Sequence, residues 1–303
     1  MISVTPISRT ARLLFVFCCL AAACAGCSKG GPTKDGVFSR ANEALAANQL
    51  RKAEEGYREV LASAPEDPTA LRQLGMLYLD QGQFPQAYPL LKKAAELQPD
   101  DAQVQLDLGF VLLAFGQLAQ ARDAARQVLE KEPGLEGALL LLTRSVESDD
   151  DLAEARKFIE SLRGQDSDRA AYHVAIGRFD LREKNPAGAE REFKAALDLD
   201  STSSGAYVGL GLLYWKRNDL PAADQAFQKA VELSPPRSAT RIGYLDFLIR
   251  TASDAAKGLL KEITAKYPDY LPPRVAAMDM ACGERWDDDC ASRRSRSLHN
   301  LIQ

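Results

Sequence analysis

The chain has 303 residues, of which 46% are hydrophobic and 7% aromatic. This apolar content is enough for one large core or for an extended array of smaller packing units. The formal net charge is −4. A mildly acidic chain presents no basic face to phosphate groups, so we expect no nucleic-acid partner.

Residues 1–27 have the pattern of an export signal. Arg9 and Arg12 precede an apolar run, Leu13–Ala23, and no acidic residue interrupts this region. A helix that spans a bilayer needs about 20 apolar residues, and this run is much shorter. The pattern therefore predicts a signal peptide and not a stable transmembrane helix.

Small residues lead from the apolar run to two cysteines, an arrangement that resembles the lipobox of bacterial lipoproteins. Cys27, which follows Ala25 and Gly26, is the predicted lipidation site, with Cys24 as the alternative. A plain secretory signal with incidental cysteines is a further alternative. No aspartate follows either cysteine, which by this resemblance implies a lipid anchor in the outer membrane of the bacterial cell envelope, facing the periplasm. Residues 28–34 are rich in Gly, Pro and Lys and are predicted to form a flexible tether.

After the tether, three series of residues recur with one period of 34 residues. The alanines of the first series are Ala53, Ala87, Ala121, Ala155, Ala189 and Ala223. The glycines of the second are Gly75, Gly109, Gly177 and Gly211. The prolines of the third are Pro65, Pro99, Pro133 and Pro235. Three series with a shared period indicate internal structural repeats.

The period and the residue types resemble those of the tetratricopeptide repeat, over residues 34–303. The resemblance implies an all-α fold, a right-handed α-solenoid (alpha-alpha superhelix) of about eight helix-turn-helix units. The expected units are 34–67, 68–101, 102–135, 136–169, 170–203, 204–236, 237–270 and 271–303. Each unit is expected to contain two antiparallel helices, A and B.

The recurring residues have expected mechanical roles. The glycine on helix A and the alanine on helix B are expected to face each other, because small side chains let two helices approach closely. Large residues four positions after the alanine are expected between successive units. Asn48, Gly82, Gly116 and Asn218 fall at the turns between helices A and B, where a positive φ is needed.

No pattern of catalytic or cofactor-binding residues stands out. His173 and His299 are the only histidines, and no glycine-rich phosphate loop or nucleophile elbow is present. We therefore expect no catalytic residue, no cofactor, no metal and no small-molecule substrate. Cys282 and Cys290 fall on the two helices of the last unit, where the oxidising periplasm permits a disulfide. Two small buried thiols are the alternative.

The resemblance also implies a binding surface, because helix A of each unit forms the concave wall of such a superhelix. The apolar residues at the expected groove positions are Leu79, Leu106, Phe110, Leu113, Val174, Leu181, Val208, Leu212 and Trp215. The interleaved cations are Arg72, Arg144, Arg178, Arg182 and Lys216. This groove predicts a protein partner whose segment carries apolar anchors and carboxylates. Alternatively, the apolar members simply pack between neighbouring A helices.

The complete layout, a lipobox followed by many repeats, resembles lipoproteins associated with exopolysaccharide and PEP-CTERM/exosortase loci. It predicts a non-catalytic protein–protein interaction scaffold, anchored by lipid at the periplasmic face of the envelope, that acts as an adaptor in exopolysaccharide or protein export or in surface assembly. The alternative is a pilotin-like or outer-membrane assembly lipoprotein that serves pilus or secretin biogenesis. An enzyme is the least favoured class, because no segment outside the repeats is long enough for a catalytic domain.

Overall fold

The computed structural model describes residues 33–273, apart from residues 167–168, 236, 269 and 271. Within these residues the chain forms fourteen α-helices and no β-strand, which confirms the predicted all-α solenoid. None of the described helices combines the length and the apolar character needed to cross a bilayer. The predicted lipidation sites, Cys24 and Cys27, and the predicted disulfide partners, Cys282 and Cys290, lie outside the described residues.

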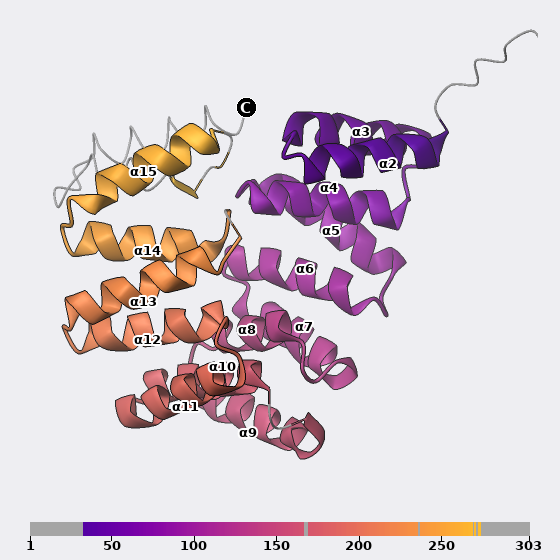
Figure 1. Ribbon diagram of the computed structural model, residues 1–303. Helices are drawn as coiled ribbons and strands as arrows, with labels where there is room; N and C mark the ends of the chain where they lie inside the picture. The colour runs from indigo at the N-terminus through magenta and orange to yellow at the C-terminus, as the bar shows by residue number, and fades with distance from the viewer. Residues whose placement is uncertain (1–32, 167–168, 236, 269, 271, 274–303) are drawn as a thin grey trace, which may run out of the picture.

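The helices follow one another in antiparallel hairpins that stack into a curved array (Figure 1). The first eight are α2 (Lys34–Ala46), α3 (Leu50–Ser63), α4 (Pro68–Asp80), α5 (Phe84–Leu97), α6 (Ala102–Ala114), α7 (Leu118–Lys131), α8 (Glu136–Arg144) and α9 (Asp149–Asp166). The last six are α10 (Ala170–Arg182), α11 (Pro186–Leu199), α12 (Ser204–Lys216), α13 (Leu220–Glu232), α14 (Ala239–Arg250) and α15 (Ala255–Lys266). The even-numbered helices correspond to helix A, and consecutive ones from α4 to α12 contact each other.

Side chains that cap the first turn set where several A helices begin. The Asp67 carboxylate accepts a hydrogen bond from the backbone N–H of Ala70 (2.9 Å), and Asp101 accepts one from Val104 (3.0 Å). The Ser203 hydroxyl caps α12 in the same way. Such caps satisfy N–H groups that have no partner within the helix, and each typically contributes about 1 kcal/mol.

A left-handed residue reverses the chain inside most hairpins. The residues expected there are confirmed: φ is 57° at Asn48, 75° at Gly82, 71° at Gly116 and 59° at Asn218. Lys184 (φ 59°) and Ala252 (φ 52°) take the same conformation in later turns, although neither residue type indicates it. This conformation costs an L-residue roughly 1–2 kcal/mol, so the packing of the hairpin imposes it.

The fourth hairpin departs from the regular geometry. Helix α8 ends early, at Arg144, and α9 begins at Asp149. The Asp151 carboxylate accepts hydrogen bonds from the N–H groups of Glu147 (3.2 Å) and Ser148 (3.1 Å), and it pairs with Arg122 on α7 (2.8 Å). The early end of α8 places the Arg144 side chain at a helix C-terminus, where a cation is favoured.

The repeated glycines make room for large side chains, which supply the atoms nearest to the place of a glycine Cβ. The atoms nearest to a Cβ at Gly177 belong to the Phe193 ring, at 2.6 Å, and those nearest to a Cβ at Gly75 belong to Leu91. The Phe193 ring also fills the place of a Cβ at Gly209 on α12, at 2.3 Å. A long side chain on helix B spans the gap between helices more fully than alanine does. Phe193 thereby joins its own hairpin to the next one.

The array curves until its seventh hairpin approaches its second. Arg237, in the connection before α14, interacts electrostatically with Asp80 at the end of α4, and Tyr270 interacts with both. Figure 1 shows the connection between α13 and α14 beside the C-terminal end of α4. Desolvation raises the pKa of Asp80, and nearby Asp107 raises it further, whereas Arg237 lowers it. Tyr270 is only 4% exposed.

We expect Gly177→Ala to lower the free energy of unfolding by up to about 2 kcal/mol. The added methyl group overpacks a contact that Phe193, fixed between two hairpins, cannot relax, at about 1–3 kcal/mol, while alanine recovers about 1 kcal/mol of helix propensity. Gly258→Ala in α15 is the control, because no neighbouring atom lies within 4 Å of the place that its added Cβ would occupy, and it should stabilise by about 0.5–1 kcal/mol. Urea unfolding followed by circular dichroism measures both changes. Equal effects at the two positions would contradict this account of the packing.

Candidate partner-binding groove

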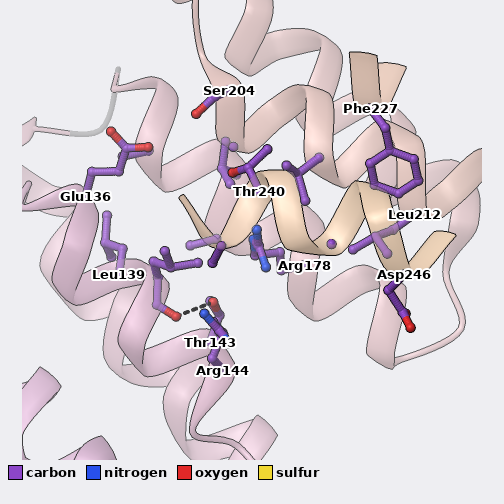
Figure 2. A pocket seen from close by; sticks show the side chains of 18 of the residues that line it. Glu136, Leu139, Thr143, Arg144, Arg178, Ser204, Leu212, Phe227, Thr240 and Asp246 are labelled. Atoms are coloured by element: carbon purple, nitrogen blue, oxygen red, sulfur yellow. Dashed lines mark hydrogen bonds between the residues drawn. The ribbon is translucent and has the colours of Figure 1, made fainter. Parts of the chain in front are cut away.

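A pocket of about 290 Å³ lies on helices α8, α10, α12 and α14, the A helices of four successive hairpins (Figure 2). Its lining is largely apolar, with Leu139, Val174, Val208, Leu212 and Trp215 among the residues that form it. Each helix contributes one face because the repeat aligns the A helices side by side. The concave wall therefore contains a hollow that can accept apolar side chains of a bound segment.

The structure brings six of the fourteen predicted groove residues together around this pocket. They are Arg144, Val174, Arg178, Val208, Leu212 and Trp215. They come from α8, α10 and α12, three successive A helices of which the first belongs to the irregular fourth hairpin. The predicted groove positions are therefore adjacent in space where the array bends.

The other predicted apolar residues lie elsewhere. Leu106 and Leu181 are buried, at 4% and 8% exposed, and belong to the core. Leu79, Phe110 and Leu113 are partly buried and pack against the core clusters of the N-terminal half. These residues therefore pack between neighbouring helices, and they do not line the pocket.

Three of the predicted cations are held by the protein itself. The Arg72 guanidinium pairs with the buried Asp107 carboxylate on the next A helix (2.7 Å). Arg182 donates a hydrogen bond to the carbonyl oxygen of Val146 (2.7 Å), and Lys216 donates one to a carbonyl oxygen of α10 (3.2 Å). These three side chains connect successive hairpins, and none of them lines the pocket.

Arg144 and Arg178 are different. Among the residues that the structure describes, neither guanidinium has a hydrogen-bond or ion-pair partner, and the Arg178 Nε atom is buried. Desolvation lowers the pKa of Arg178, and the nearby charge of Arg144 lowers it further, while Glu136 raises it. Desolvation also lowers the pKa of Arg144, although part of its side chain stays exposed. Both groups remain cationic at neutral pH, because a guanidinium holds its proton.

Several residues around the pocket were not predicted from the sequence. Glu136, Ser204, Thr240 and Asp246 supply polar groups to its lining (Figure 2). The Asp246 carboxylate is paired with Arg250 one turn along α14 (2.8 Å). The groove positions of the family do not include these places, so the family pattern did not indicate them.

We expect Arg178→Gln to raise the midpoint of thermal unfolding by a few degrees. The wild-type guanidinium is desolvated and close to a like charge, and removing an uncompensated charge relieves that cost; about 1 kcal/mol corresponds to roughly 2–4 °C for a domain of this size. Arg182→Gln is the matched control. It should lower the midpoint, because the Val146 carbonyl oxygen loses its donor. Scanning calorimetry measures the midpoint of both variants. A lower midpoint for Arg178→Gln would contradict the conclusion that the Arg178 charge is desolvated and uncompensated.

Two protein-family models match the repeats of this chain. Residues 44–108, 78–134 and 112–178 match one family model described as tetratricopeptide repeat, and residues 174–238 match a second one with the same description. Together these matches run without interruption over well over half of the chain. No match was found among curated proteins.

Several solved structures of repeat proteins are similar to this chain. A tetratricopeptide repeat protein from Parabacteroides merdae is 13% identical, with a TM-score of 0.54, and the match covers 82% of this chain and 100% of that one. A thermophilic tetratricopeptide-repeat protein of Thermus thermophilus is 20% identical, with a TM-score of 0.49 and coverages of 60% and 99%. PilW, described as a widely conserved type IV pilus biogenesis factor, is 13% identical, with a TM-score of 0.43 and coverages of 82% and 100%.

These likenesses concern the fold alone, because all three identities are low. The matched family models, the helical hairpins and the period of 34 residues agree with one another. The chain therefore belongs to the tetratricopeptide-repeat family, whose repeats form scaffolds for protein–protein interaction.

Proposed function

We propose that the chain is a non-catalytic adaptor that binds a segment of a partner protein in the groove of α8, α10, α12 and α14. One observation carries the proposal: an apolar hollow in the concave wall contains two arginines that have no partner among the described residues. Apolar surface in contact with water and cations that have lost hydration without gaining a partner both raise the free energy of the unbound protein. A bound segment with apolar side chains and carboxylates removes both costs.

The proposed location is the periplasmic face of the outer membrane. Its support is the sequence alone, namely the signal pattern of residues 1–27 and the lipobox-like arrangement before Cys27. One acyl chain binds a membrane only marginally, whereas the two or three chains of a lipobox cysteine anchor firmly. Within the envelope, we propose a role in exopolysaccharide or protein export or in surface assembly. The alternative role in pilus or secretin assembly stays a prediction of the sequence resemblance.

Photo-crosslinking in cells tests the groove. With a benzoylphenylalanine at Val208, which lines the pocket, we expect covalent adducts to a discrete partner protein; at Leu199, an exposed residue on helix α11, we expect none. Leu212→Glu should abolish the adducts at Val208, because a carboxylate in the apolar lining is costly to desolvate. Mass spectrometry of the adducts identifies the partner. Equal crosslinking at Val208 and Leu199 would refute the groove as the binding surface.

Fractionation tests the anchor separately. Cys27→Ser should move the protein from the outer-membrane fraction to the soluble periplasm and abolish labelling by radioactive palmitate, since the thiol that carries the lipid is gone. Cys24→Ser serves as the control and should change neither. Loss of labelling in Cys24→Ser alone would make Cys24 the lipidation site, and labelling that persists in both variants would defeat the proposed anchor.

A further inference from the structure

Arg144 and Arg178 define a charged subsite within the otherwise apolar pocket. We propose that this pair binds the side-chain carboxylate of one aspartate or glutamate in a partner segment, with a large apolar side chain of the same segment in the hollow beside it. The inference rests on the proposed function, since it names the chemistry that the groove selects. It is argued from the burial of the Arg178 Nε atom and from the charges and unused donors of both arginines.

The donors of the pair are available. A guanidinium presents five N–H groups in a planar fork that matches a carboxylate in a bidentate arrangement. Among the described residues none of these groups on Arg144 or Arg178 has an acceptor, and the buried Nε of Arg178 has lost its water as well. Figure 2 shows the Arg178 side chain in the middle of the pocket, with Arg144 and Thr143 nearby on α8. A carboxylate between them supplies the missing acceptor.

The electrostatics favour an anion over any neutral ligand. Desolvation and the nearby charge of Arg144 both disfavour the charged form of Arg178 and lower its pKa. Two like charges in a desolvated place are costly unless a counter-charge joins them. Hydrogen bonds to charged groups contribute roughly 1.5–3 kcal/mol each. Glu136 offsets part of this cost in the unbound protein, and a bound carboxylate offsets more of it.

The surroundings limit the ligand to a single carboxylate next to an apolar group. Val174, Val208 and Leu212 form the apolar part of the lining, and about 290 Å³ is small for a ligand pocket, which usually measures ~300–1,000 Å³. One or two side chains therefore fit. Glu136 and Asp246 also border the pocket, and their charges disfavour a run of acidic residues.

A side-chain carboxylate suits the place of the pocket better than a chain terminus does. The pocket lies on four successive A helices, and the series of A helices continues beyond the pocket with α6. An internal acidic residue lets the bound segment continue past the pocket in both directions along the A helices. A terminal carboxylate would end the segment there, and the experiment below separates the two cases.

The test uses two displayed libraries of random peptides, one internal and one with free C-termini. The purified full-length protein is screened as the wild type, as Arg144→Gln/Arg178→Gln and as the control Arg51→Gln, which changes an exposed arginine on α3. Wild type and Arg51→Gln should enrich one Asp or Glu adjacent to a large apolar residue in the internal library. The double variant should keep the apolar preference and lose the acidic one. Circular dichroism verifies that all three proteins are folded.

An enriched peptide is then resynthesised with its acid replaced by the corresponding amide. We expect the wild type to bind the amide peptide at least about tenfold more weakly, equivalent to about 1.4 kcal/mol, and the double variant to bind both peptides within about twofold. Apolar enrichment without an acid overturns the subsite and leaves the groove proposal standing. Acid selection confined to free C-termini overturns the side-chain assignment. No enrichment by the wild type overturns both the subsite and the proposed function.

Discussion

The close approach of helices around a buried aromatic ring is the contact on which the solenoid depends. Phe193 lies between Gly177 of its own hairpin and Gly209 of the next, and a single methyl group at either glycine would collide with the ring. One hairpin later, Phe227 meets Gly211 of its own hairpin. Because no hairpin buries its apolar face alone, such shared contacts stabilise neighbours and not isolated units. They also fix the spacing at which the A helices present their inner faces.

Binding chemistry follows from that spacing. Most cations on the A helices are used within the array: Arg72 pairs with Asp107, and Arg182 holds the turn after α8. Arg144 and Arg178 line an apolar pocket at the point where α8 is short and the array bends. Neither guanidinium has a partner among the described residues. A protein that keeps two desolvated, adjacent cations carries a cost in stability. A partner that supplies a carboxylate removes the cost, so the same arrangement weakens the free protein and strengthens a complex.

The periodic sequence is sufficient to predict the all-α solenoid, because each hairpin depends on local signals that repeat every 34 residues. Ala53 and its five equivalents are at most 1% exposed, and the glycines and asparagines expected in turns adopt positive φ. Sequence patterns predict which residues are buried in a helical core and which residues form turns. Six of the residues that the pattern assigns to the inner face line the pocket, since the face of a helix follows from its period.

The chain's own residues thus determined the repeat, the helices and the inner face, all of which depend on contacts between neighbours in sequence. Tertiary structure alone decided which side chains meet over long distances. It paired Arg72 and Arg182 inside the protein, left Arg144 and Arg178 open, and brought Arg237 and Tyr270 to Asp80 across the array. The physical reason is that small angular offsets between hairpins add up along a solenoid. Their sum sets the curvature, and no single repeat contains that information.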